Sequence, residues 1–302
     1  MIAGKKAKTV GGWRKFGKSS VQLVYIEDEN GAQASHLHRA DKLSALPSTE
    51  EFKMDIGKSF SYIAEDKNWV EKLGVGAVIS MIPIVNFAAF GYQVKIARNV
   101  WRGEERPLPA WNEFGKLFVD GLRIVGAMLV YMLPIILVYS VLAIGLVAFS
   151  IMAESGGYTP SAGGDELAGI MIAMMSISML CLMPYMLLVW LLYPLFFIQV
   201  ARHGSIQSCF ALRDMWAQIK AQPANYLLIV GIIFGVYMVL SIVVMPIYLV
   251  TMFIPCIGFI VMMLLSGVMT ILVGAVSGHL EGQFMREADG LPALGSMEEN
   301  LV

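Results

Sequence analysis

The sequence predicts an all-α fold: a polytopic helical membrane protein with about five transmembrane helices kinked by proline and two interfacial amphipathic helices. The first observation is a set of five long apolar stretches, none with an ionisable side chain in its central part. They cover residues 73–94, 124–152, 167–200, 225–249 and 252–280. Each is long enough to cross a bilayer, which takes about 20 apolar residues. The second observation is that only 15% of the residues are charged, against about a quarter in soluble domains.

We divide the chain into a polar N-terminal extension (residues 1–53), a multi-pass membrane domain (54–284) and an acidic C-terminal tail (285–302). The extension begins with a basic cluster: Lys5, Lys6, Lys8, Arg14, Lys15 and Lys18. Such a cluster can bind anionic lipid headgroups at a membrane surface, and a solvated tail is the alternative. Val21–Ile26 has the composition of a strand. No apolar segment follows the basic cluster, so we expect no cleavable signal peptide.

The first apolar stretch, residues 73–94, allows two arrangements. As a full span it gives five spans and places the N-terminal region outside. As a re-entrant hairpin broken near Pro83 and Asn86 it leaves the N-terminal region inside. We favour five spans. The third stretch, residues 167–200, would be about 50 Å long as a helix, so it must tilt, kink or project beyond the bilayer.

Two polar segments resemble each other, and each follows an apolar stretch. One contains Gln93–Arg98 and the other Gln199–Arg202. Each precedes an amphipathic pattern typical of an interfacial helix. The apolar faces are Phe114, Leu117, Phe118 and Leu122 in the first pattern, and Leu212, Met215, Trp216 and Ile219 in the second. The recurrence indicates a parallel helix–interface–helix repeat, although the identity between the copies is low.

The basic residues predict the orientation of the chain. Residues 95–123 contain six Lys or Arg and residues 202–222 contain three, whereas residues 153–166 contain none. Short loops rich in Lys and Arg stay in the cytoplasm, so the first two segments are predicted inside and the third outside. Tryptophans at segment boundaries are expected to anchor the protein at the membrane interface. These are Trp69, Trp101, Trp111 and Trp216.

Small residues form a stripe at helical spacing in the last apolar stretch. Its members are Ser266, Thr270, Gly274, Gly278 and Gly282, and a shorter pair is Gly231 and Gly235. Small residues let two helix backbones approach closely. The stripe therefore predicts either packing within the bundle or a contact with the helix of a partner subunit.

No motif for catalysis, cofactor binding or metal binding occurs in the sequence. His279 and Glu281 lie at the end of the last apolar stretch, where we expect them to be solvated. We therefore predict a protein that is not an enzyme, has no cofactor or metal, and contacts lipids and other membrane subunits but no nucleic acid. The predicted function is that of an accessory or scaffolding subunit. The alternative is a passive channel or carrier for a small neutral or lipidic solute, lined by Asn86, Gln93, Tyr185, Tyr193 and Gln199.

Residues 66–121 carry a family resemblance. They include Asp66-Lys67-Asn68-Trp69, Ile82-Pro83-Ile84-Val85-Asn86, Gly91-Tyr92, Arg98-Asn99-Val100, Gly103, Pro107–Gly115 and Phe118-Val119-Asp120-Gly121. From Met54 to about Phe284 the chain resembles an uncharacterised family of bacterial and archaeal multi-pass membrane proteins, the domain-of-unknown-function family 4013. The resemblance implies an integral membrane domain and no more. We expect the protein to lie in a prokaryotic cytoplasmic membrane. Ala110 and Asn112 stand where that family tends to have acids, which argues against a role for an acidic cluster here.

Overall fold

A computed structural model describes residues 12–16, 19–23, 54–154, 164–251 and 253–291. The chain divides into two compact units, Met1–Phe52 and Lys53–Val302. In the first unit, β1 (Gly12–Phe16) and β2 (Ser19–Leu23) form an antiparallel pair with Gly12 opposite Leu23. β2 overlaps the predicted strand at its first three residues, Val21–Leu23, and the remainder of that prediction lies outside the described residues.

The second unit is all-α, as predicted, and contains eight helices among the described residues. They are α2 (Lys58–Glu65), α3 (Trp69–Met81), α4 (Phe87–Arg102), α5 (Phe114–Glu154), α6 (Gly164–His203), α7 (Leu212–Ala221), α8 (Pro223–Thr251) and α9 (Pro255–Ala288). Two short 3-10 turns, η1 (Trp111–Glu113) and η2 (Gln207–Phe210), precede α5 and α7.

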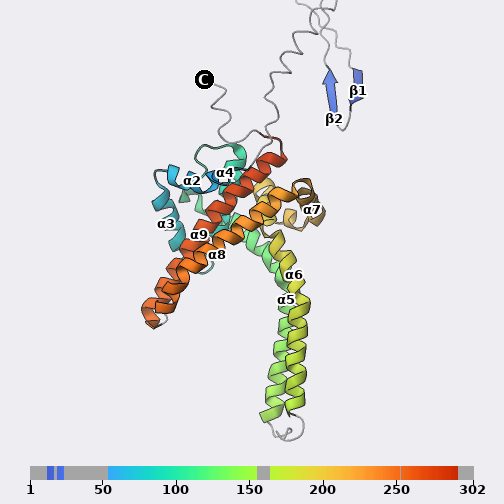
Figure 1. Cartoon of the computed structure of the whole chain (residues 1–302), viewed down its shortest axis with the longest axis vertical. Coiled ribbons are helices and arrows are strands. Elements are labelled where there is room, and N and C mark those ends of the chain that lie inside the picture. The colour runs from blue at the N-terminus through green and yellow to red at the C-terminus, as the bar shows by residue number, and fades with distance from the viewer. Residues whose placement is uncertain (1–11, 17–18, 24–53, 155–163, 252, 292–302) are drawn as a thin grey trace, which may run out of the picture. The chain divides into compact units, whose positions relative to one another are not determined.

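Four of the described helices are long and apolar enough to cross a membrane, which confirms the polytopic helical fold. They are α5, α6, α8 and α9. α5 and α6 run side by side as one hairpin, and α8 and α9 pack together as another (Figure 1). Proline lies inside three of the four, at Pro134, Pro184, Pro194 and Pro246.

The first apolar stretch differs from the favoured prediction of a full span. It is divided between α3 and α4, which are separated by a turn at residues 82–86. At 1.5 Å per residue, helices of 13 and 16 residues are about 20 and 24 Å long, less than the 30 Å hydrocarbon core. The turn contains Pro83, which has no N–H to continue a helix, and Ile84, which has a left-handed φ of 70°. The break near Pro83 and Asn86 that the re-entrant alternative requires is therefore observed.

The first predicted interfacial helix is also different in the structure. Phe114, Leu117, Phe118 and Leu122 belong to the first three turns of α5, which continues without a break into the span. The prediction of a separate helix was wrong because no proline or glycine turn divides these residues from the apolar stretch. The second interfacial helix is observed as α7, where Met215 is buried and Trp216 is half exposed.

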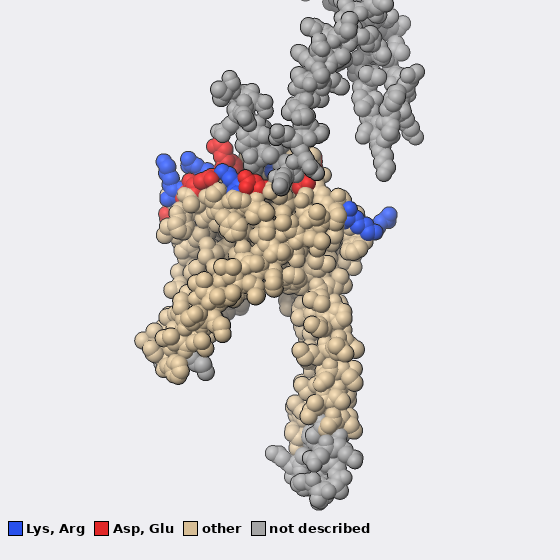
Figure 2. Space-filling model, viewed as in Figure 1, with Lys and Arg blue, Asp and Glu red and all other residues tan. Residues whose placement is uncertain are grey.

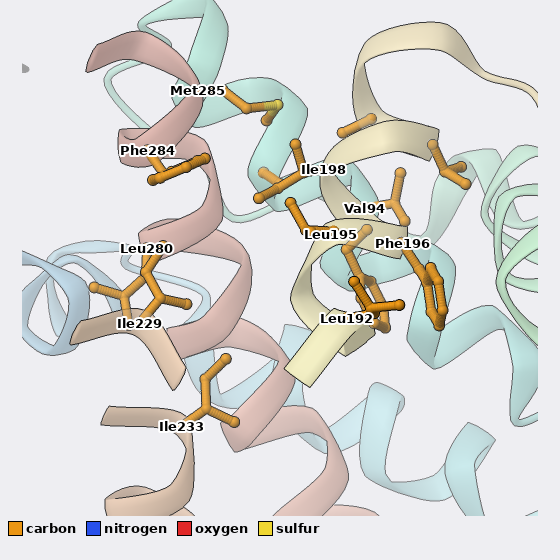
Figure 3. Packing of buried hydrophobic residues seen from close by; sticks show 14 of the residues in the cluster. Val94, Leu192, Leu195, Phe196, Ile198, Ile229, Ile233, Leu280, Phe284 and Met285 are labelled. Atoms are coloured by element: carbon orange, nitrogen blue, oxygen red, sulfur yellow. The ribbon is translucent and has the colours of Figure 1, made fainter. Parts of the chain in front are cut away.

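The core lies where α4, α6, α8 and α9 meet. Leu192, Leu195 and Ile198 of α6 approach α9 residues Leu280, Phe284 and Met285 (Figure 3). Ile229 and Ile233 of α8 and Val94 of α4 complete this cluster. The charged side chains of the second unit gather near one end of the visible face, and the two hairpins below carry none on that face (Figure 2).

Candidate functional site

Three arginines link the ends of α4, α6 and α9 in a closed ring, which we call the arginine ring. Arg98 of α4 donates to the backbone oxygens of Val200 and Ala201 in the last turn of α6, at 3.2 and 3.1 Å. Arg202 of α6 donates to the backbone oxygen of Met285 near the end of α9, at 3.2 Å.

Arg286 of α9 closes the ring by donating to the backbone oxygens of Val100 and Trp101 in the last turn of α4, at 3.4 and 3.0 Å. The last four carbonyls of a helix have no partner within it, and positive charge is favourable at this end of the helix dipole. Each arginine therefore stabilises the end of the next helix, and the three helices are locked together at one end.

Left-handed glycines follow the same three helices. Gly103, Gly204 and Gly290 have φ angles of 80°, 59° and 65°, a conformation that glycine adopts without the steric cost borne by other residues. The similarity of the segments after Gln93 and Gln199 thus has a structural counterpart, since both end in an arginine of the ring and a left-handed glycine. α9 supplies a third copy.

A polar cluster, formed by exposed Asp55 and by the buried side chains of Ser59, His279 and Gln283, holds the start of α2 against α9. The side-chain amide of Gln283 accepts the Asp55 N–H at 2.7 Å and donates to the Asp55 carbonyl at 2.9 Å. The same amide nitrogen lies 3.0 Å from Nδ1 of His279, which also contacts the Ser59 hydroxyl at 3.0 Å. These contacts tie the start of α2 to the C-terminal part of α9.

The expectation that His279 and Glu281 are solvated was wrong. His279 is 1% exposed and stacks on Tyr62 with ring centroids 4.4 Å apart. Glu281 is fully buried; one carboxylate oxygen accepts from the Gln93 amide at 2.8 Å. Its other oxygen has no hydrogen-bond partner among the described residues. Both residues are covered because α2 and α4 pack on α9, a contact between segments far apart in the sequence.

The motif that carries the family resemblance forms a second cluster, which joins α3, α4 and the loop before α5. Lys72 donates to the Asp66 carboxylate at 2.7 Å and to the Leu108 carbonyl at 2.8 Å. Trp111 donates to the Lys72 carbonyl at 2.7 Å and stacks on Tyr92, with centroids 4.6 Å apart. Burial raises the pKa of Asp66, but the hydrogen bonds from Lys72 and from a backbone N–H together outweigh this effect. The pKa of Asp66 is therefore lowered overall.

Two glycines of the same motif allow α4 and α5 to cross in contact. A Cβ added to Gly91 would lie 1.7 Å from the backbone oxygen of Leu117, and one added to Gly121 would lie 1.7 Å from the backbone oxygen of Phe87. Beside this crossing, Arg98 pairs with Asp120 at 3.0 Å. The motif residues therefore build the helix junction.

The small-residue stripe of α9 divides into two parts. A Cβ on Gly278 would lie 2.7 Å from the Gln93 carbonyl oxygen, and one on Gly282 would lie 2.5 Å from Cβ of Val100. Gly274 faces the Gln93 side chain at 3.5 Å. These three positions pack inside the chain against α4. Ser266 is exposed and Thr270 partly so, and no atom lies within 4 Å of a Cβ placed on Gly231 or Gly235.

The four predicted tryptophan anchors have different surroundings. Trp69 and Trp216 are 40% and 50% exposed, as expected of interfacial side chains. Trp101 donates to the Asp289 carboxylate at 2.7 Å and lies under the guanidinium of Arg202 at 5.8 Å, and Trp111 packs on Tyr92 as described. In the basic cluster, Arg14 and Lys15 lie in β1, and the other four bases lie outside the described residues.

The five residues proposed to line a channel do not line either of two shallow pockets on the described surface. One pocket, of about 290 Å³, is formed by α3 and the loop before α5, and the other, of about 260 Å³, by α4 and α5. Gln93 contacts Glu281, Tyr185 donates to the Tyr131 carbonyl at 2.5 Å, and Gln199 is buried with its amide nitrogen unpartnered. No group of three potential metal ligands occurs among the described residues.

The sequence contained a signal for the arginine ring that we did not use. Gln283 and Arg286 have the same spacing as Gln199 and Arg202. The third copy was missed because it lies beyond the last apolar stretch, in a segment interpreted as solvated. No local signal marks Glu281 as buried, since its partner Gln93 is 188 positions away.

The comparisons with known proteins give one match. A family model described as "Protein of unknown function (DUF4013)" matches residues 75–249, more than half of the chain, and confirms the resemblance. The match begins inside α3 and ends inside α8, so it leaves out α2 and α9. No curated protein and no solved structure matches the chain.

Proposed function

The chain belongs to the DUF4013 family of proteins of unknown function, and we propose that it is a non-catalytic accessory or scaffolding subunit of a larger membrane complex. The observation that carries this proposal is a contrast within the second unit. Its buried polar groups are largely used to join helices, whereas the outer faces of its two long hairpins are left uncovered.

The apolar parts of α5 and α6 are less covered by the rest of the chain than those of α8 and α9. In the most apolar part of Trp111–Ala148 no residue is buried. In the most apolar part of Ile172–His203 only 6% of the residues are buried. Leu180 of α6, for example, is 71% exposed. Helices associate in membranes through close packing, and small residues favour it. Gly231 and Gly235 of α8 keep such a face open, which supports a contact with the helices of other subunits.

The arrangement of polar groups favours a scaffold over the alternative of a passive channel or carrier. A carrier site is a concave pocket with a few convergent polar groups. Here the arginines of the ring donate to helix ends, and neither pocket is lined by the five polar residues considered for a channel. A rigid junction that holds two apolar hairpins is the arrangement expected of a subunit that positions other helices.

The test is site-specific photo-cross-linking in the native membrane. A benzoyl-phenylalanine at Leu180 is expected to capture one discrete polypeptide, whereas the same group at buried Leu195 of the same helix should capture none. Native mass spectrometry in mild detergent should show that polypeptide in fixed stoichiometry. Lipid adducts alone at Leu180, together with the mass of a single chain, would refute the proposal. Solute flux through liposomes containing the purified chain alone would favour the carrier instead.

A paired substitution tests whether the open glycine face makes the contact. Gly235→Leu adds a side chain where no neighbour lies within 4 Å, so the chain should fold normally and lose the co-purifying polypeptide. Gly278→Leu places the same side chain against the Gln93 carbonyl and should reduce folded protein. Retention of the partner by a folded Gly235→Leu protein would exclude this face as the contact.

A further inference from the structure

A shallow basic pocket, which shares Arg98 with the arginine ring, lies between the second half of α4 and the start of α5. Its volume is about 260 Å³. It is lined by Lys95, Arg98, Arg102, Glu113, Lys116, Leu117 and Asp120. Four bases and two acids give this lining a formal charge of +2 (four minus two). We propose that the pocket binds the phosphate group of an anionic membrane lipid.

The two acids of the pocket are already engaged by bases. Asp120 accepts from Arg98 at 3.0 Å and also from Arg123. Glu113 accepts from Lys116 at 2.7 Å and lies 3.7 Å from Lys95. The positive charge of the pocket is therefore only partly neutralised, and an anion would supply the missing charge.

Arg102 provides the recognition group. It is exposed, and it forms no ion pair with the residues that the structure describes. A guanidinium presents its donors in a planar fork that matches two oxygens of a phosphate. Lys95, which is bound weakly at 3.7 Å, can add a second contact on the same wall of the pocket.

The surroundings of the pocket favour a lipid over a soluble phosphate. The pocket lies at the start of the α5 span, and α5 continues with outward apolar side chains at Val119, Leu122 and Leu129, each between 45% and 56% exposed. A headgroup in the pocket would be held at the level where the apolar span begins. Basic pockets beside transmembrane helices on the cytoplasmic side suit anionic headgroups, and the distribution of Lys and Arg predicts this end of the protein to be cytoplasmic.

The experiment uses the full chain, delipidated in a neutral detergent, and measures thermal stabilisation by added phosphatidylglycerol, phosphatidylcholine or inorganic phosphate. The test variant is Lys95→Gln with Arg102→Gln. The matched control is Arg213→Gln, which removes an exposed base of α7 outside the pocket. Exposed ion pairs contribute little to stability, so all three proteins should unfold at similar temperatures without lipid.

We expect phosphatidylglycerol to stabilise the wild-type chain more than phosphatidylcholine. Each removed base should weaken the apparent affinity about five-fold, which corresponds to about 1 kcal/mol, so the double variant should lose about 25-fold and the Arg213→Gln control should match the wild type. Equal effects of the two lipids, or an equal loss in the control, would overturn the proposal. Equal stabilisation by inorganic phosphate would assign the pocket to a soluble anion and overturn the lipid assignment.

Discussion

The crossing of α4 and α5 gives the sharpest prediction, because one added methyl group would meet main-chain atoms. In Gly121→Ala the new Cβ would lie 1.7 Å from the backbone oxygen of Phe87 and 3.1 Å from the backbone nitrogen of Gly91. Non-bonded heavy atoms normally approach to about 3.5 Å, so the two helices must separate by more than an ångström. Neither neighbour is a flexible side chain that could turn away.

The expected magnitude follows from two opposing effects. Replacing glycine by alanine inside a helix stabilises it by about 1 kcal/mol. Overpacking costs about 1–3 kcal/mol, occasionally more, and this contact belongs at the upper limit because backbone meets backbone. We therefore expect a net loss of about 2 kcal/mol, or a fall of roughly 4–8 °C in Tm for a domain of this size. Gly115→Ala is the control, since it lies on α5 with no atom within 4 Å of its added Cβ.

Cys209 provides the measurement. Its thiol is fully buried, and burial raises its pKa to about 11, so at pH 7.5 it should react with a fluorogenic maleimide only after the chain unfolds. Replacing Cys181 and Cys256 by serine leaves this thiol as the reporter. Gly121→Ala should expose Cys209 at a clearly lower temperature than Gly115→Ala does. Identical midpoints for the two variants would show that α4 and α5 do not cross as described.

Three further predictions concern the arginine ring, the Asp66 carboxylate and the orientation of the chain in the membrane. Arg202→Gln removes the donor to the Met285 carbonyl and the 3.0 Å ion pair with Asp289, and should lower stability by about 1–3 kcal/mol in the same thiol assay; no change in the midpoint would contradict the role of the ring. The pKa of Asp66 is lowered in the folded state, so its stabilisation is present above the unfolded pKa of about 3.9 and is lost as pH falls through the folded value. Asp66→Asn should therefore lose less stability than wild type on acidification, as measured by tryptophan fluorescence. A cysteine at Ser205 should resist an impermeant maleimide in intact cells, whereas one at Ser161, which lies outside the described residues, should react; the opposite pattern would reverse the predicted orientation.

The sequence predicted the elements that depend on local composition. α5, α6, α8 and α9 were recognised because an apolar run of sufficient length is a property of each segment by itself. α7 was recognised for the same reason, because its apolar and charged residues alternate at helical spacing. The division of residues 73–94 was present as an alternative, marked by Pro83, but the length of the apolar run favoured a single span.

The remaining features depend on residues that are distant in the sequence. Glu281 and His279 are buried because α4 and α2 cover them, and no property of α9 alone predicts that cover. The sequence left open whether the stripe of small residues packs within the bundle or against a partner, and only the structure shows that Gly278 and Gly282 meet α4. Predicting the arginine ring would have required a comparison of three helix ends, and only the segments that follow Gln93 and Gln199 were compared.

The short hairpin α3–α4 determines on which side of a membrane the start of the second unit would lie. Four spans would place α2 on the same side as the segment before α5, the connection between α6 and α8, and the end of α9. That side carries the two segments rich in Lys and Arg, so the positive-inside rule is satisfied without placing a polar region outside. The arginine ring is compatible with either number of spans, because the end of α4 leads directly into α5 in both. The contact that requires the short hairpin is that of Asp55 with Gln283 of α9. A fully spanning first helix would place α2 on the opposite side from the end of α9.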